Sequence, residues 1–478
     1  ISFIEDCAVE LTDLADYTDR LTKVFTKHGT TGTWYAHASV GCLHVRPVLN
    51  LKQEMDVKKM RAVAEEAFAM VREYKGSHSG EHGDGLVRSE FHEVMFGTRM
   101  VKNFAEVKRL FDPGNLMNPG KIVNPSKMDD RTLFRYKPDY QTKMPETALD
   151  WSGWDGFAGA VEMCNNNGAC RKRDAAVMCP SFRATSEEKH LTRGRANALR
   201  LAISGQLGPD AFTSKPMYEA MGLCVSCKGC KRECPVGVDM ARMKVEFLYH
   251  YVKRHGLGLR ERLIAYLPRY AASASRLHFL FNLRDTIPGL PWLSERLLGF
   301  SAKRPLPVWH SAPVLGSDEP GVGEVGTNGR EVVLWVDTFN TYHEPQNARA
   351  ALNVLRAAGY TVHVPTPADS NRPACCGRTF LSAGLVDEAK AEATRLIGAL
   401  APYAKKGIPI IGLEPSCVLS LRDEFPVMME DVALDAITKN SFLFEEFLAT
   451  EHEAGRLDLA FRDNGPAKVL LHGHCHQK

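Results

Sequence analysis

Hydrophobic and polar positions recur with clear periods in the first 125 residues, which predicts a segment of mixed strands and helices. Two strands are predicted at 33–39 and 42–48, and Gly41 marks the turn between them. A helix is predicted from Asp56, its candidate N-cap, to about Tyr74. Its apolar stripe has helical spacing and comprises Val57, Met60, Val63, Ala64, Ala67, Phe68 and Val71. A further helix is predicted to end near residue 111, where Asp-Pro-Gly follows.

Two polar stretches without periodicity divide the rest of the chain. Residues 126–150 and 305–330 are both predicted to be linkers, and the second is rich in proline and glycine. Residues 151–304, between the two linkers, have mainly helical patterning. The sequence therefore predicts three domains, at 1–125, 151–304 and 331–478.

The last predicted domain alternates strands with helices. The order is strand, helix, strand, helix, strand, at residues 331–336, 345–358, 361–365, 386–400 and 408–413. Such alternation is typical of an α/β layer built on a parallel sheet.

Composition and charge exclude some classes of partner. A net charge of +3 is too small to indicate nucleic acid or an anionic surface. No run approaches the roughly 18 apolar residues that a membrane-spanning helix requires, so we expect a soluble protein. The chain begins at Ile1 without an initiator methionine and stops at Lys478 inside an apparent motif. We therefore expect it to be part of a longer protein.

Four of the thirteen cysteines form the most specific motif in the sequence. They follow the pattern C-x-x-C-x-x-C-x-x-x-C-Pro, at Cys224, Cys227, Cys230 and Cys234. Three thiolates at this spacing bind one face of a [4Fe-4S] cluster, and the cysteine before proline usually ligates the other cluster of a two-cluster ferredoxin. A zinc ribbon is the weaker alternative, because the spacing suits a cubane better than tetrahedral zinc.

A partner motif lies upstream and contains Cys164, Cys170 and Cys179, the last of which precedes a proline. When this motif is aligned with the ferredoxin pattern, Asn167 occupies the position of the middle cysteine. In two-cluster ferredoxins the last cysteine of each motif ligates the cluster of the other motif. This exchange predicts one complete [4Fe-4S] cluster, held by Cys179, Cys224, Cys227 and Cys230. A possible second site retains only Cys164, Cys170 and Cys234. Three thiolates permit a [3Fe-4S] cluster, a cubane with a non-cysteine ligand, or an empty site.

Histidines and a carboxylate form a second candidate site. His37 and His44 lie seven residues apart across the predicted turn, and Glu81 and His82 stand in a glycine-rich stretch at 76–85. Two imidazoles and one carboxylate are a normal ligand set for Zn²⁺, Mn²⁺ or Fe²⁺. From spacing alone, however, structural histidines are the stronger interpretation.

Three motifs resemble, in order, the C-terminal domain of FAD-linked oxidases. They are His37-x-x-x-Gly-Cys-Leu-His44, Ser79-Gly-Glu-His-Gly-Asp-Gly85 and Phe111-Asp-Pro-Gly-Asn-Leu-Met-Asn-Pro-Gly-Lys121. The resemblance covers roughly residues 1–125 and points to the D-lactate, glycolate and D-2-hydroxyglutarate dehydrogenase group. It implies an α+β domain whose FAD is held mostly by an upstream domain outside this chain.

The resemblance also implies roles for individual residues. His37, His44 and Glu81 would be ligands of a divalent metal, Zn or Mn, and His82 would face the substrate as a candidate base. Asn118 and Lys121, in the Asn-Pro-Gly-Lys motif, would lie near the flavin. The chain departs from the family pattern at Arg46, since relatives usually have an asparagine two residues beyond the second histidine. We expect Arg46 to meet a substrate carboxylate instead.

The last third of the chain resembles the cysteine-rich CCG domain of heterodisulfide reductase and anaerobic glycerol-3-phosphate dehydrogenase subunits. The matching residues are Cys375-Cys376-Gly377 and Glu414-Pro-Ser-Cys417. Complete versions bind a cluster through five cysteines, whereas Glu414 replaces one of them here. The predicted fold class is thus an α+β oxidase domain, a helical ferredoxin-like Fe–S domain and a truncated α/β CCG-type domain.

The whole order resembles an iron–sulfur flavoprotein that oxidises a D-2-hydroxy acid, with D-2-hydroxyglutarate favoured and D-lactate or glycolate as alternatives. Electrons would pass from flavin through the cluster to an external acceptor, a quinone or an electron-transfer protein. A different class remains open, an electron-transfer subunit with a structural His/Glu site. We expect a cytoplasmic homo-oligomer without nucleic-acid or membrane contact, since prolines at 259–300 favour ordinary packing over a membrane surface.

Overall fold

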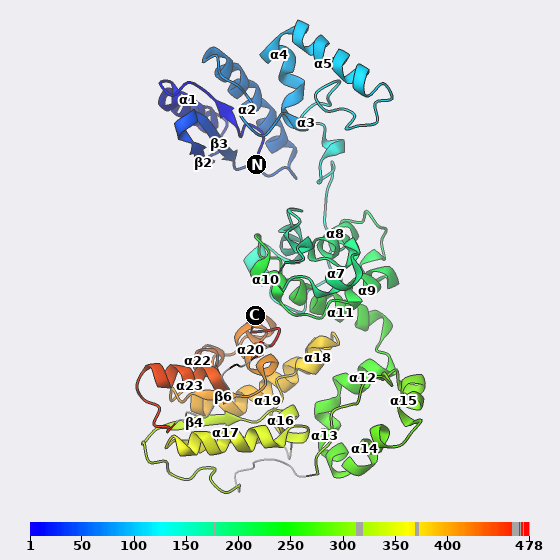
Figure 1. Ribbon diagram of the computed structural model, residues 1–478, viewed down its shortest axis with the longest axis vertical. Helices are drawn as coiled ribbons and strands as arrows, with labels where there is room; N and C mark the ends of the chain where they lie inside the picture. Colours follow the sequence, from blue (N-terminus) through cyan, green and yellow to red (C-terminus); the bar gives the residue numbers. More distant parts are fainter. Residues whose placement is uncertain are drawn as a thin grey trace. The chain divides into compact units, whose positions relative to one another are not determined.

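The computed structural model describes residues 1–174, 177–311, 319–368, 372–460, 468, 470–471 and 473–477. The chain divides into two compact units, Ile1–Gln141 and Thr142–Lys478 (Figure 1). The second unit contains both of the predicted domains 151–304 and 331–478. Parts of the predicted linker 305–330 and of the last predicted domain lie outside the described residues.

The first unit packs helices on one face of a small antiparallel sheet. The strand order is β1-β3-β2. The elements are β1 (Cys7–Ala8), α1 (Leu14–Lys27), β2 (Gly32–His37), β3 (Cys42–Pro47), α2 (Glu54–Glu73), α3 (Gly85–Arg88), α4 (His92–Phe96) and α5 (Thr98–Phe111). Both predicted strands, both predicted helices and the mixed character of this segment are confirmed.

The core of the first unit lies between β3 and the apolar stripe of α2. Every residue of the predicted stripe is buried, and Leu43 and Val45 of β3 join the same core. The predicted N-cap is wrong, because the helix begins at Glu54 with Gln53 as its N-cap. Asp56 lies in the first turn, where its Oδ2 accepts the amide hydrogen of Asn50 at 2.8 Å and closes the preceding loop.

The turn between β2 and β3 requires glycine at position 41. Gly41 has φ +70°, in the left-handed region, and its carbonyl oxygen accepts the amide hydrogen of Val9 at 3.1 Å. A Cβ atom at this position would lie 1.9 Å from the Val9 carbonyl oxygen. Glycine at position 41 therefore lets the turn lie directly against Val9, the residue that follows β1.

The first part of the second unit is helical. Its helices are α6 (Phe157–Glu162), α7 (Pro180–Thr185), α8 (Thr192–Ile203), α9 (Lys215–Gly222), α10 (Gly229–Glu233), α11 (Met240–His255), α12 (Leu259–Ala265), α13 (Leu267–Arg276), α14 (His278–Thr286) and α15 (Leu290–Leu298). No helix among the described residues is both long and apolar enough to cross a membrane.

The second part is an α/β layer with a parallel sheet in the order β5-β4-β6-β7, as the alternation predicts. The strands are β4 (Glu331–Trp335), β5 (Thr361–His363), β6 (Ile410–Gly412) and β7 (Ser441–Leu443). The helices are α16 (Thr338–Tyr342), α17 (Pro345–Ala357), α18 (Arg378–Ser382), α19 (Val386–Ala404), α20 (Pro415–Asp423), α21 (Phe425–Met428), α22 (Leu434–Asn440) and α23 (Phe444–Glu453). The sequence did not predict β7, which has only three residues.

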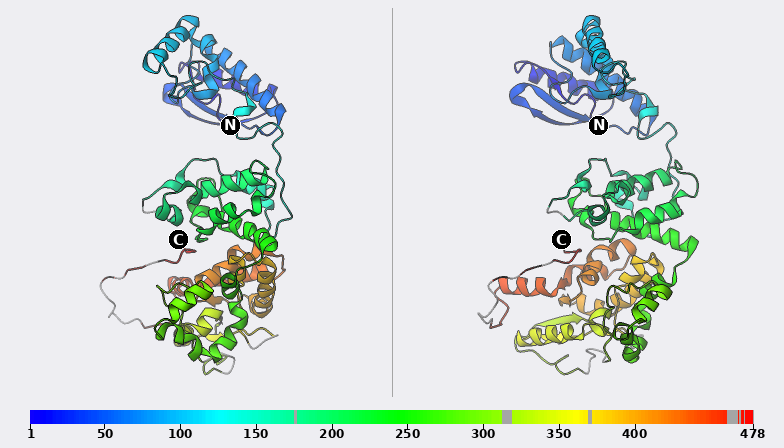
Figure 2. Two further views of the ribbon diagram at one scale, coloured as in Figure 1. Left: turned by 90° about the vertical axis from the view of Figure 1, so that its right-hand side faces the viewer. Right: turned by 45° about the vertical axis from the view of Figure 1, so that its right-hand side comes forward.

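Helices cover both faces of this sheet (Figures 1 and 2). Val332 and Leu334 of β4 share a core with α17, whereas Val333 and Trp335 share another with α19. This second core continues into the helical part of the unit and includes Phe247 of α11. The helical part and the α/β layer are therefore joined through one apolar interior.

We predict that Gly41→Ala destabilises the first unit far more than Gly29→Ala. Both glycines have positive φ, but nothing lies within 4 Å of a Cβ at Gly29. The control substitution should cost about 1–2 kcal/mol of unfolding free energy, from backbone strain alone. Gly41→Ala adds the collision with Val9, and amide hydrogen exchange in β3 should accelerate only in this variant. Equal exchange in the two variants would contradict the prediction.

Candidate metal and iron–sulfur sites

A buried carboxylate, that of Asp6, holds the loop that carries two of the predicted site residues. The amide of Glu81 donates to both carboxylate oxygens at 3.0 Å, and the amide of His82 donates to Oδ2 at 2.8 Å. The Ser79 hydroxyl donates to Oδ2 at 3.1 Å. Burial alone would raise the pKa of Asp6, but these amide donors outweigh it and hold the pKa below the usual value. Asp6 thus remains ionised and orders the loop.

The strand register places His37 and His44 on one face of the sheet. His44 of β3 pairs with Tyr35 of β2, and His37 pairs with Cys42. Cross-strand partners share a face, and so do residues two apart along a strand. The imidazoles of His37 and His44 consequently lie with ring centroids 5.1 Å apart.

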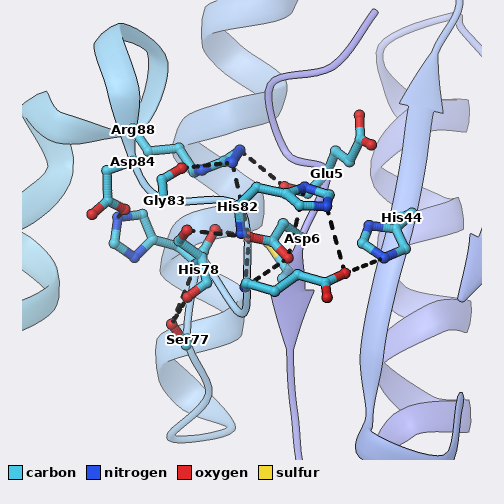
Figure 3. Close-up of polar contacts among 12 residues, drawn as sticks. Glu5, Asp6, His44, Ser77, His78, His82, Gly83, Asp84 and Arg88 are labelled. Carbon is cyan, nitrogen blue, oxygen red and sulfur yellow. Dashed lines mark hydrogen bonds and ion pairs between the residues drawn. The ribbon is translucent and has the colours of Figure 1, made fainter. Parts of the chain in front are cut away.

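Glu81 brings the two histidines together. Its Oε1 lies 2.9 Å from Nε2 of His44 and 3.3 Å from Nε2 of His37. His82 stacks on His44 with ring centroids 4.9 Å apart, and its Nε2 is 3.5 Å from the same Glu81 oxygen. Figure 3 shows the rings of His44 and His82 side by side, with Asp6 next to His82. Ligand atoms of Asp6, His44, Glu81 and His82 all lie within 4.8 Å of one another.

His82 also lines an open cleft together with Asn118 and Lys121. The cleft has a volume of about 720 Å³, and its walls include the apolar side chains of Phe104 and Phe111 from α5. Asp112, at the end of α5, accepts the amide hydrogens of Leu116 and Met117 at 2.9 Å and shapes the loop before Asn118. Three residues that the resemblance places near substrate or flavin therefore share one cavity.

Arg46 lies on the same strand face as His44 but is engaged by Glu5. Its Nε and Nη2 donate to the two carboxylate oxygens at 3.2 and 3.1 Å, and Tyr35 donates to the same carboxylate at 2.8 Å. Tyr35 also stacks on His44 at 4.9 Å. Half of the Arg46 side chain remains exposed. The structure thus keeps Arg46 next to the site, with one edge paired and the rest open to solvent.

Sequence reasoning missed Glu5 and Asp6. Both precede the first strand in a short apolar context, Phe-Ile-Glu-Asp-Cys, and both are buried. Two adjacent acidic residues between apolar neighbours are the available signal, since a buried carboxylate has to be hydrogen-bonded or paired. Their partners lie some 40 and 75 positions away, so the pattern itself does not reveal them.

The four cysteines predicted for the complete cluster surround one cavity of the second unit. Its lining includes Cys179, Cys224, Cys227 and Cys230. Two residues of the loop, Ser226 and Lys228, have positive φ, which tightens the turn between the cysteines. Lys228 and Lys231 fasten the loop to Asp423 of α20, each at 2.6 Å.

The three cysteines of the possible second site, Cys164, Cys170 and Cys234, are not among the residues that line this cavity. Cys164 and Cys170 are both buried, and burial raises the pKa of Cys170, with smaller contributions from Cys179 and Cys164. The side chain of Asn167, at the position of the missing cysteine, bonds to Asn165 and to the amide of Ala169. Cys234 is half-buried at the end of α10. The identity of this second site remains a prediction.

The three cysteines of the CCG-like motifs do converge. Cys376 and Cys417 have their sulfurs 3.2 Å apart, and Cys375 accepts the amide hydrogen of Gly377 at 3.4 Å. All three are buried. Glu414 instead caps α20 by accepting the amide hydrogen of Ser416 at 3.1 Å. The residue that replaces a cysteine thus has a structural use, and assignment to the CCG type remains a prediction.

Family models match the segment with the His/Glu residues and the segment with the cysteines at 164–234. Residues 1–122 match the family model of the C-terminal domain of FAD-linked oxidases. Residues 160–238 match the model of the 4Fe-4S dicluster domain. The chain resembles iron–sulfur FAD-linked dehydrogenases. The resemblance to FAD-linked oxidases and the prediction of a ferredoxin-like 4Fe-4S domain are thereby confirmed, and the histidine, glutamate and asparagine motifs fall inside the first match.

Curated relatives cover most of the chain. D-2-hydroxyglutarate dehydrogenase of Escherichia coli (strain K12) is 27% identical across 95% of this chain and 48% of that protein. The enzyme of the same name from Pseudomonas putida is 28% identical across 88% of this chain and 45% of its own length. One subunit of anaerobic glycerol-3-phosphate dehydrogenase from Escherichia coli (strain K12) is 27% identical across 31% of this chain and 36% of its own length. The chain spans about half the length of the D-2-hydroxyglutarate dehydrogenases that it matches.

The Glu5–Arg46 pair predicts a specific pH dependence. Burial by itself would raise the pKa of Glu5, but hydrogen bonds from Arg46 and Tyr35 lower it to about 2. A glutamate in an unfolded chain has a pKa near 4.3, so the pair stabilises β3 fully above that pH. Its contribution is lost as the pH falls from about 4 towards 2.

We predict that Glu5→Gln lowers the free energy of opening of β3 by about 1 kcal/mol, because Arg46 is half exposed. The deficit should be equal at pH 7 and pH 5.5 and should shrink below about pH 4. Amide hydrogen exchange of residues 42–47 measures it. Glu54→Gln, which removes an exposed helical ion pair with Lys58, is the control and should leave β3 unchanged. A deficit that already shrinks between pH 7 and pH 5.5 would contradict the assignment.

Proposed function

We propose that this chain belongs to a dehydrogenase that oxidises a D-2-hydroxy acid, D-2-hydroxyglutarate before others, to the 2-oxo acid. The carrying observation is the convergence of His37, His44, Glu81 and His82 beside a cleft that Asn118 and Lys121 also line. Four curated relatives carry the name D-2-hydroxyglutarate dehydrogenase, which supports this substrate. The proposal concerns the whole protein, since this chain spans about half the length of those relatives.

The donor set of His37, His44 and Glu81 fits a divalent cation. Both imidazoles approach the same carboxylate oxygen, and Nδ1 of the buried His44 has no hydrogen-bond partner among the described residues. Nitrogen and oxygen donors in this ratio suit Zn²⁺ or Mn²⁺. A cation held there would supply Lewis-acid chemistry, lowering the pKa of a bound hydroxyl group.

His82 is placed to act as the general base of this reaction. It is half exposed, lines the cleft and lies beside the carboxylate of Asp6, whose Oδ1 is 3.9 Å from Nδ1. When Nε2 takes a proton from a substrate, the negative charge of Asp6 stabilises the resulting imidazolium. The amide of His82 is bonded to Asp6, which holds the backbone that carries the ring at the edge of the cleft.

The cleft offers an apolar wall and two polar residues to a flavin. Phe104 and Phe111 supply the apolar contacts, and Asn118 and Lys121 supply a hydrogen-bond donor and a positive charge. Bound FAD would supply the two-electron acceptor that side chains lack. Arg46, with its open edge, would meet the second carboxylate of a dicarboxylic substrate.

The second unit would carry electrons onward. Cys179, Cys224, Cys227 and Cys230 fit the ligands of one [4Fe-4S] cluster, since they line a single cavity. Cys164, Cys170 and Cys234 are proposed for a second cluster, in keeping with the dicluster domain match. The external acceptor is proposed to be a quinone or an electron-transfer protein, and the complete protein to be a homo-oligomer.

Two other functions have some support from the comparisons. Similarity to a glycolate oxidase subunit of Bacillus subtilis, 24% identical over 24% of the chain, favours glycolate as the substrate, and D-lactate is the other alternative hydroxy acid. Similarity to a probable glycolate oxidase iron-sulfur subunit of Bacillus subtilis, 29% identical over 17% of the chain, favours a protein that only relays electrons. The second alternative gives the His/Glu cluster no catalytic part.

A flavin-bleaching experiment on the full-length protein separates these functions. D-2-hydroxyglutarate, D-lactate and glycolate are added in turn without oxygen, and flavin absorbance in the visible range is followed. We expect D-2-hydroxyglutarate to bleach the flavin fastest, EDTA to abolish bleaching, and Zn²⁺ or Mn²⁺ to restore it. His44→Gln should slow bleaching by about 10²-fold or more, because it removes a buried ligand.

The control for this experiment is His28→Gln, which alters a histidine paired with Glu66 and should bleach normally. Normal bleaching in the His44→Gln protein would refute the metal-assisted mechanism. If no hydroxy acid bleaches the flavin, the electron-relay function is favoured instead.

Substitution of single cysteines tests the proposed cluster ligands. Cys179→Ser should remove about four iron atoms per chain and the broad visible absorbance of the cluster, because the cluster loses one of four thiolates. Cys375→Ser, at a buried cysteine distant in sequence, should retain the iron content of the unchanged protein. Equal loss of iron in both variants would assign a cluster to the CCG-like motifs as well.

A further inference from the structure

A second group of histidine and carboxylate side chains lies next to the loop that carries Glu81 and His82. His78 and Asp84 belong to this loop, and His92 is the first residue of α4. One potential ligand atom from each residue lies within 4.8 Å of the other two. Figure 3 draws His78 beside Asp84, apart from His44. None of these three residues has a part in the proposed reaction.

The two histidines are buried and their ring nitrogens lack partners. His78 is 0% exposed and His92 is 3% exposed. Among the described residues, neither ring nitrogen of either histidine has a hydrogen-bond partner of acceptable geometry. Buried polar atoms are normally satisfied, so four such nitrogens in one place require an explanation.

Distances to Asp84 are those of ligands around one ion. Nε2 of His78 lies 3.1 Å from Oδ1 of Asp84, and Nε2 of His92 lies 3.0 Å from Oδ2. Zinc binds imidazole nitrogen and carboxylate oxygen at about 2.0–2.2 Å, which puts two ligands at roughly 90–110° about 3.0–3.5 Å apart. A simple hydrogen bond has the same length, but the contacts of both imidazoles with Asp84 fall outside the angles that such a bond prefers.

The surroundings of the three residues are apolar except for the buried guanidinium of Arg88, whose charge acts on both His78 and Asp84. The ring of His78 lies 5.4 Å from that of Phe68, and His92 lies 5.5 Å from Phe96 and 5.9 Å from Phe104. An apolar shell strengthens the attraction between a cation and a carboxylate. Asp84 and Phe104 also line the open cleft, which gives an ion a way in from solvent.

We propose that His78, Asp84 and His92 bind a divalent cation of the zinc class. Two imidazoles and one carboxylate leave a position for water, the usual arrangement for zinc with three protein ligands. The ion would join the loop at 77–85 to the start of α4 and so hold the backbone that carries Glu81 and His82. This site is separate from the one formed by His37 and His44, and it does not rest on the proposed function.

Zinc stoichiometry tests the proposal in a chain whose first site has been removed. The complete 478-residue chain with His37→Gln and His44→Gln is purified without oxygen, freed of metal by a mild chelator and equilibrated with Zn²⁺ alone. We expect one zinc per chain by mass spectrometry of the elements, with iron unchanged. Adding Asp84→Asn should weaken zinc binding by at least about tenfold, because the amide is a poor ligand. Adding Asp19→Asn, at an exposed carboxylate of α1, is the control and should have no effect.

Thermal unfolding distinguishes the ion from a hydrogen-bonded network. Zn²⁺ at about one hundred times its dissociation constant should raise the Tm of the first-site variant by roughly 5 °C. Asp84→Asn and His92→Gln in that background should each lose about half of this response or more, even if one of them folds less well. If zinc content and the Tm response persist in both variants, the proposal is wrong. Because neither flavin nor substrate is present, failure of the dehydrogenase proposal would not change this result.

Discussion

The geometry of the candidate metal site depends on the buried carboxylate of Asp6. An ionised carboxylate without contact to water is costly, and Asp6 is retained because backbone amides of the loop after Ser79 donate to it. Its own backbone takes part, since the amide of Gly80 donates to the Asp6 carbonyl oxygen at 2.7 Å. Removing the carboxylate would leave the amides of Glu81 and His82 unpaired, and these are the residues on which both the proposed metal site and the proposed base rely. One residue near the beginning of the chain thereby controls a loop some 75 positions away.

Two arginines, Arg88 and Arg46, hold the segment around Asp6 to the neighbouring loop and strand. Arg88 donates to the carbonyl oxygens of Glu5 and Gly83, both at 3.0 Å, and so links the strand segment that carries Asp6 to the end of the loop. Glu5 in turn holds Arg46 beside His44. The proposed second cation would act on the same loop from the side of α4. All of these contacts limit the freedom of the loop, as the proposed metal-assisted proton abstraction would require.

In the second unit, ion pairs hold the loop that carries the proposed cluster ligands. Lys228 and Lys231 pair with Asp423, and burial alone would raise the pKa of that carboxyl, but the two lysines lower it to about 2. The cysteine-bearing loop is consequently fixed to the α/β layer and does not depend on the helical part alone. One apolar core also spans both parts, so packing as well as charge joins the helical part to the α/β layer.

The sequence by itself determined the longer elements, the resemblance to FAD-linked oxidases, the 4Fe-4S domain and the chemistry of the candidate sites. Periodicity located α2 and the parallel sheet because both bury long, regular apolar patterns, and the cysteine spacing is local enough to indicate a cluster without any fold. Tertiary structure alone decided the rest. It paired Glu5 with Arg46, placed Asp6 beneath the Glu81 loop, and gathered His78, Asp84 and His92, since each of these contacts joins residues from different elements and leaves no period in the sequence. Short elements could not be predicted for the same reason. β7 has three residues, too few to show alternation, and it is recognised by its pairing with β6.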